Sequence, residues 1–229
     1  MLAIKQQAGG GSFDPLSITW HGVYWAEAPT WTNPGDGNAV SQWDDVSGNG
    51  AHFTQATAGS RPTYRSSVAA LNGKPALEFD GSADTMASTH TTVAQTVTWV
   101  FVARNTGTSQ GAYFDADGDF RQILSKLNAT QYRMFANSVV DVGGADAGAH
   151  LLIVQMSGST SSLAEDGVTL TGTVDPGTAG VPHTRIGSSF GSSNFMAGEM
   201  AFVGRKSGTL TTQERSDLLA WSQSHYGTP

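Results

Sequence analysis

Short strand-forming segments, separated by turns rich in glycine, asparagine, aspartate and proline, recur about every 8 to 15 residues along most of the chain. Residues 96–104 (TVTWVFVAR) are apolar on both faces, which is typical of a central strand covered on each side. Further strand candidates are residues 75–81, 131–137, 150–156 and 195–205. Because no helical segments alternate with these strands, the pattern predicts an all-β, two-sheet antiparallel sandwich of the jelly-roll type.

A helix is expected only at the end of this sandwich. Thr211 and Glu214 have the spacing of a capping box, and Gly227 is suited to stop the helix that follows. Its apolar face is predicted to be formed by Leu218, Trp221 and His225. A single domain is expected, since β-sandwiches reach 229 residues around one core.

The first residues are set apart by their composition. Gly9, Gly10, Gly11 and Ser12 resemble a flexible joint, so residues 1–15 are predicted to form an N-terminal arm before a domain of residues 16–229. The arm is either disordered or docks on a partner. No apolar run is long enough for a secretory signal or a membrane span, so we expect a chain made as a soluble cytosolic protein.

Charge and the absence of cysteine exclude several functions. The formal net charge of −7 gives a surface that repels phosphate on average, so nucleic acid is not expected as a partner. Without cysteine the chain has no disulfides, no thiolate catalysis and no thiolate metal site. The six histidines form no His-x-His or His-x-x-x-His pair, so no short-range zinc motif is present.

Five segments together carry a resemblance to a known family. They are residues 40–50 (VSQWDDVSGNG), 61–64 (RPTY), 72–81 (NGKPALEFDG), 210–215 (LTTQER) and 226–227 (YG). Their order and spacing resemble the laminin-G-like branch of the concanavalin A-like lectin/glucanase superfamily. The resemblance implies a two-sheet jelly roll with a short C-terminal helix on its edge. One departure is Phe202, which stands where relatives tend to carry a glutamate.

The resemblance also implies a function. Domains of this type recur in bacterial surface proteins and in bacteriophage tail or capsid-surface proteins, where they attach to glycans or other proteins. We therefore expect a non-enzymatic virion-surface module that contacts host glycan, joins other virion proteins through its arm, and forms a homo-oligomer or part of a larger assembly. One alternative is a purely structural decoration or cementing protein, and a second is a glycoside hydrolase.

The hydrolase alternative lacks its carboxylate set. Related glycosidases use two positioned carboxylates, and the nearest imitation here is Glu78 with Asp80, directly before a turn. Ser189 lies in a Gly-x-Ser-x-Gly pattern, but a Gly/Ser-rich stretch follows it instead of the helix that a serine hydrolase requires. The sequence predicts no catalytic residue.

An acidic run offers the one metal site suggested by the sequence. Asp115, Asp117 and Asp119 alternate around a glycine and could bind calcium from a loop, although Phe120 and Lys126 break the EF-hand pattern. The alternative is a solvated turn. No cofactor is required by the predicted function, and calcium is an optional ion.

Glycan recognition needs an aromatic platform with planar polar groups beside it. Two loop-like stretches supply such residues. The first contains Trp25, Trp31, Asp36 and Asn38, and the second contains Tyr113, Asp115, Asp117 and Arg121. Trp31 is the preferred platform, because neighbouring threonine, asparagine, proline and glycine residues argue against its burial in a strand.

Overall fold

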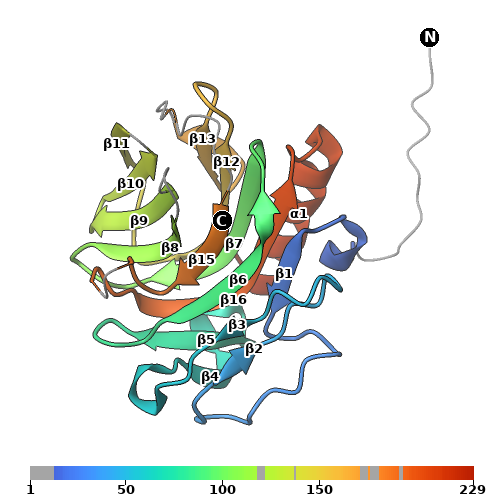
Figure 1. The fold of residues 1–229 in the computed structure, drawn as a ribbon, viewed down its shortest axis with the longest axis vertical. Coiled ribbons are helices and arrows are strands. Elements are labelled where there is room, and N and C mark those ends of the chain that lie inside the picture. The colour runs from blue at the N-terminus through green and yellow to red at the C-terminus, as the bar shows by residue number, and fades with distance from the viewer. Residues whose placement is uncertain (1–12, 118–121, 137, 171–174, 176–180, 191–192) are drawn as a thin grey trace.

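The computed structural model describes residues 13–117, 122–136, 138–170, 175, 181–190 and 193–229. Two antiparallel sheets and one C-terminal helix make up the described fold, so the predicted fold class is confirmed (Figure 1). The helix is α1 (Thr212–Tyr226), and three short 3-10 turns are η1 (Pro15–Ser17), η2 (Ala58–Ser60) and η3 (Ala69–Leu71). No helix among the described residues is long and apolar enough to cross a membrane.

Each sheet has eight strands, and we call them sheet A and sheet B. Sheet A runs in the order β14 (Val168–Leu170), β13 (Ser162–Glu165), β12 (Ala149–Met156), β7 (Val97–Asn105), β16 (Ala197–Ser207), β5 (Lys74–Asp80) and β4 (Thr63–Val68), and β1 (Gly22–Trp25) also pairs with β16. Sheet B runs in the order β11 (Ser138–Gly143), β10 (Gln131–Ala136), β9 (Gln122–Asn128), β8 (Gly111–Asp117), β15 (Val181–Ile186), β6 (Met86–Val93), β3 (Phe53–Thr54) and β2 (Gln42–Trp43).

The main core lies between the two sheets. Strand β7, which the sequence predicts to be central, contributes large aromatic side chains to it. Trp99 and Phe101 of β7 point inward, and Trp99 stacks on Phe114 of β8 with ring centroids 4.7 Å apart. Val100 and Val102 point to the opposite face and join a second apolar cluster. Because side chains alternate along a strand, a segment that is apolar on both faces needs a cover on each side.

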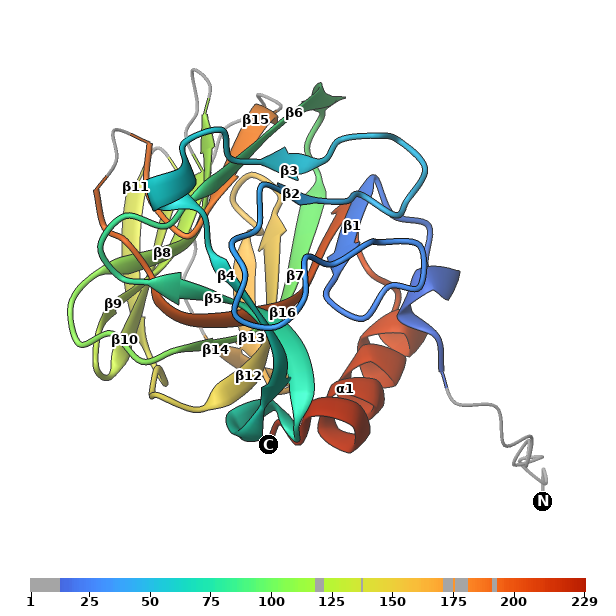
Figure 2. The same cartoon turned by 90° about the horizontal axis from the view of Figure 1, so that it is seen from below.

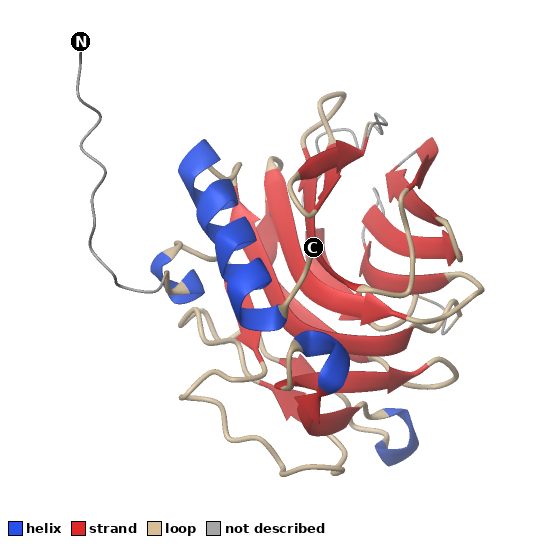
Figure 3. Cartoon of the chain, turned by 180° about the vertical axis from the view of Figure 1, so that it is seen from behind, coloured by secondary structure: helices blue, strands red, loops and turns tan. Residues whose placement is uncertain are grey.

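Helix α1 supplies the second cover. Leu218 and Trp221 pack with Val100 and Phe202 on the outer face of sheet A. Figure 3 shows the helix lying against the strands of this sheet. The helix therefore lies across the face of a sheet, and the expectation that it packs on the edge is wrong. The predicted capping box is present: Glu214 N–H donates to Thr211 Oγ1 at 3.1 Å, and Thr211 N–H donates to Glu214 Oε2 at 2.7 Å.

Two turns are formed by residues that suit their geometry. Asp166 and Gly167 join β13 to β14 with φ angles of 46° and 82°, as an Asp-Gly hairpin requires. Asp45 accepts the backbone N–H groups of Val23, Ser47 and Ala51, which holds the turn after β2 against β1. The turn chemistry thus determines where these strands begin and end.

Candidate functional site: an aromatic cleft between the first strand and the last helix

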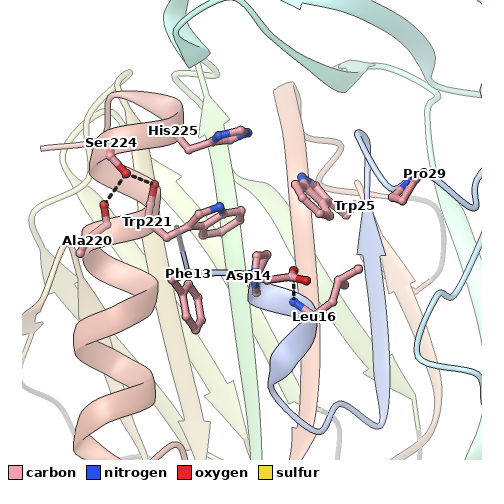
Figure 4. Close-up of a pocket in the computed structure, with 10 residues that line it drawn as sticks. Phe13, Asp14, Leu16, Trp25, Pro29, Ala220, Trp221, Ser224 and His225 are labelled. Atoms are coloured by element: carbon pink, nitrogen blue, oxygen red, sulfur yellow. Dashed lines mark hydrogen bonds between the residues drawn. The ribbon is translucent and has the colours of Figure 1, made fainter. Parts of the chain in front are cut away.

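Figure 2 shows η1 beside α1, near the two ends of the described chain. A cleft of about 570 Å³ opens between them (Figure 4). Its walls come from η1 and β1 near the start of the described chain and from α1 near its end. They include Phe13, Asp14 and Leu16 beside η1, Trp25 of β1, and Trp221 and His225 of α1. Figure 4 shows Trp221 and His225 projecting from α1 toward Trp25, with Asp14 and Leu16 below them. We call this the aromatic cleft.

The N-terminal wall is held by short-range hydrogen bonds. Asp14 Oδ1 accepts the N–H of Leu16 at 2.9 Å and caps η1. Trp20 Nε1 donates to the carbonyl of Pro15 at 2.8 Å, and the Pro15 side chain is buried. Phe13 to Pro15, which the sequence assigned to the arm, therefore already pack on the body of the domain. The predicted docking of residues 1–12 lies outside the described residues.

Three rings form the aromatic wall. Trp25 and Trp221 meet edge to face with centroids 6.1 Å apart, and His225 stacks on Trp221 at 5.9 Å. Trp25 Nε1 donates to the hydroxyl of Tyr226 at 2.8 Å, so the indole is fixed in its orientation. Burial raises the pKa of Tyr226 well above its usual value, which keeps this hydroxyl protonated. The three rings are therefore held in place before any ligand binds.

The polar groups in and beside the cleft include two carboxylates and one imidazole. His225 Nε2 lies 2.7 Å from Glu27 Oε1, and Lys74 Nζ lies 3.9 Å from the other oxygen of Glu27. The carboxylate of Asp14 is exposed at the rim. None of the described residues that line the cleft is a lysine or an arginine. An apolar aromatic wall with carboxylate and imidazole groups beside it can hold a hydroxyl-rich ligand through both ring contact and hydrogen bonds.

Of the aromatic platforms predicted from the sequence, only Trp25 lines this cleft. Trp31 packs edge to face on Tyr64 at 5.6 Å, and its Nε1 donates to the carbonyl of Gln42 at 3.2 Å. It is 6% exposed, the same fraction as Trp221, but unlike Trp221 it does not line the aromatic cleft. Tyr113 is 2% exposed and belongs to the core between the sheets. The expectation that Trp31 escapes burial is therefore wrong, because its ring turns inward from a loop to cover the core.

The polar partners predicted around Trp31 stabilise the loop itself. Asp36 accepts the N–H of Ser66 at 2.8 Å, and this bond lowers the pKa of the Asp36 carboxyl. Asn38 Nδ2 donates to the carbonyl of Pro34 at 3.0 Å. Both side chains are exposed, and neither lines the aromatic cleft. Their predicted role in ligand binding stays a prediction.

The predicted calcium ligands fall partly outside the described residues. Asp115 is fully buried in β8, where Oδ2 accepts the N–H of Phe190 at 2.7 Å. The backbone of Asp117 ends the same strand, so these two residues do not form the expected loop. Asp119 and Arg121 lie outside the described part of the chain. Calcium binding at this run stays a prediction.

The carboxylates and the serine of the hydrolase alternative have structural partners. Glu78 Oε2 pairs with Arg65 Nε at 2.5 Å. Although burial opposes it, hydrogen bonds from Ser82, Ala83 and Asp84 lower the pKa of Asp80 to about 2. Ser189 is buried, and its hydroxyl accepts from Asn194 Nδ2 at 3.2 Å. The Glu78 contact joins β4 to β5, and the contacts of Asp80 and Ser189 hold turns.

Sequence reasoning missed most of the cleft. It placed Trp221 and His225 on the apolar face of a helix, but it had no means to bring that face to Trp25 at the other end of the chain. It also placed Phe13 and Asp14 in the arm. The available signal was the i, i+4 spacing of Trp221 and His225, which marks one helical face and not its partner.

No family model and no curated protein matches the sequence. Among solved structures, Trypanosoma rangeli sialidase aligns over 92% of this chain at 17% identity with a TM-score of 0.65. The binding domain of botulinum neurotoxin serotype G aligns over 84% at 10% identity with a TM-score of 0.59. This chain spans 34% of the sialidase chain and 54% of the toxin domain. The likeness shows a shared sheet-rich fold, while the superfamily branch and the phage setting stay predictions.

Proposed function

We propose that this chain is a non-enzymatic carbohydrate-binding module whose aromatic cleft holds one neutral sugar unit of a glycan. The observation that carries the proposal is the fixed pairing of Trp25 and Trp221 in a cleft of about 570 Å³. A pyranose ring has an apolar face that packs on indole, and its hydroxyls need planar acceptors and donors at the ring edge. Asp14 and His225 supply such groups.

The charge of the cleft favours a neutral ligand over an acidic one. Trypanosoma rangeli sialidase has been solved in complex with sialic acid. Here Asp14 lines the cleft and Glu27 pairs with His225 beside it, and no described lining residue is a lysine or an arginine. A sugar carboxylate would face the exposed carboxylate of Asp14 with no lysine or arginine in the described lining to offset the repulsion, which is unfavourable. We therefore infer selectivity for neutral hexoses against sialylated glycans.

Binding to a glycan array, followed by titration calorimetry with the best neutral oligosaccharide, tests this function. Trp25→Ala is expected to weaken binding at least tenfold, or about 1.4 kcal/mol, because it removes one wall of the platform. His225→Ala is expected to weaken it as well, and His183→Ala serves as the matched control, since His183 is exposed on β15 away from the cleft.

The outcomes separate the rival functions. A blank array with folded protein would favour the structural decoration role, and release of reducing ends from polysaccharides would favour a hydrolase. Binding that survives both cleft variants would place the ligand elsewhere. The virion setting, the attachment to other virion proteins and the oligomeric state belong to the same proposal, and electron microscopy of labelled protein in a lysate of the producing cells would test the setting.

A further inference from the structure

A second cluster of functional groups lies at the far edge of sheet A, away from the aromatic cleft. His150 is near the start of β12, and Glu165 and Asp166 lie at the end of β13 and in the turn after it. One donor atom from each of these residues lies within 4.8 Å of the other two. Their side chains are only 7%, 9% and 11% exposed, respectively. Sequence spacing gave no sign of this group, because a strand pairing brings its members together.

The donor atoms have the spacing of ligands around one small ion. His150 Nδ1 lies 2.6 Å from Asp166 Oδ2 and 3.4 Å from Glu165 Oε1. In a tetrahedral site with bonds of about 2.0 Å, two ligand atoms are about 3.3 Å apart. If the distance between His150 Nδ1 and Asp166 Oδ2 lengthened from 2.6 Å to about 3.3 Å, an ion would fit between the three atoms.

Outer hydrogen bonds already orient each group. Asp146 Oδ1 lies 2.8 Å from His150 Nε2 and favours a proton on that nitrogen, so Nδ1 can bind an ion once it gives up the proton that it shares with Asp166 Oδ2 at 2.6 Å. The hydroxyl of Tyr132 donates to Glu165 Oε1 at 2.5 Å. The N–H of Leu151 donates to Asp166 Oδ1 at 2.9 Å, which turns Oδ2 toward the imidazole. Carboxylate–histidine support of this kind is typical of metal ligands.

Among the described residues, one basic side chain, His150, pairs with the cluster, and its single charge does not balance the three carboxylates. Asp146, Glu165 and Asp166 contribute three carboxylates, and their ion pairs among the described residues are all with His150. The nearby Lys126 Nζ donates instead to the backbone carbonyls of Asn105 at 2.7 Å and Asp146 at 2.5 Å. A buried group of carboxylates favours a cation between them.

We propose that His150, Glu165 and Asp166 form a binding site for one divalent transition-metal ion of the zinc class. An imidazole nitrogen with two carboxylate oxygens suits zinc, whereas calcium takes six to eight oxygen ligands. Water would complete the coordination. The ion would join the start of β12 to the β13–β14 turn and so stabilise this edge of sheet A.

Titration of chelator-treated protein with zinc sulfate, by calorimetry and by competition with a chromogenic chelator, tests the site. The expected result is one ion per chain with a rise in melting temperature. Asp166→Asn is the main variant, because asparagine tolerates the left-handed φ of 46° at this position while losing the charge. We expect affinity to fall at least tenfold in Asp166→Asn and in His150→Gln.

Asp141→Asn is the matched control, since this carboxylate pairs with Arg133 on neighbouring strands outside the cluster. It should bind zinc like the parent chain, and circular dichroism verifies that every variant is folded. Failure of the parent chain to bind zinc would overturn the proposal. The protonated imidazole of His150 would then be the only positive charge among the three carboxylates. Equal affinity in Asp166→Asn and the parent chain would also overturn it.

Discussion

At the scale of single residues, Trp31 shows how a loop side chain can belong to the core. Its ring packs against Tyr64 and Trp43, and it is buried although its neighbours are turn-forming residues. We expect Trp31→Ala to lower the free energy of unfolding by about 3–5 kcal/mol, because it leaves a cavity between aromatic rings. Urea denaturation measures this, with Trp31→Phe as the milder control. A change below about 1 kcal/mol would mean that the ring is not part of the core.

At the scale of elements, α1 forms one wall of the cleft, so its stability affects the site. Its first turn is held by the reciprocal bonds of Thr211 and Glu214, and Glu214 Oε1 also pairs with Lys206 Nζ at 2.7 Å. Thr211→Ala should cost about 1 kcal/mol, because it leaves an N–H of the first turn without its acceptor. Hydrogen exchange of the α1 amides detects the loss, and Thr212→Ala, one residue later, should show less of it. Equally fast exchange of the α1 amides in Thr211→Ala and Thr212→Ala would show that Thr211 does not cap the helix.

At the scale of the whole molecule, β6 carries a histidine that makes the sandwich sensitive to acid. Burial, followed by the charge of Arg205, lowers the pKa of His90 to about 4 from its usual 6.5. A lowered histidine pKa adds stability that is complete above pH 6.5 and is lost as the pH falls toward 4. We expect a loss of about 2 kcal/mol over this range, since solvent screens part of the effect.

Thermal melts between pH 7 and pH 4 measure this loss. The variant His90→Gln should show a flatter profile than the parent chain, because it removes the titrating group and keeps a polar side chain at the position. Identical profiles for the two proteins would show that other groups cause the acid sensitivity.

The sequence predicted those features that depend on neighbours along the chain. The two-sided apolar segment predicted the central place of β7, and the capping box predicted the start of α1. The cleft and the His150 cluster depend on which distant elements meet, and side-chain periodicity carries no such information. For the same reason, the inward turn of Trp31 could not be predicted, since no strand alternation governs a loop residue.

The central claim is that the aromatic cleft is the ligand site, and indole N–H signals test it most directly. The six tryptophans give separate ¹⁵N indole resonances, two from the cleft and the others from elsewhere in the fold. Titration with a neutral oligosaccharide should shift the Trp25 and Trp221 signals and leave those of Trp31 and Trp43 in place. Shifts confined to Trp31, or none at saturating sugar, would contradict the account.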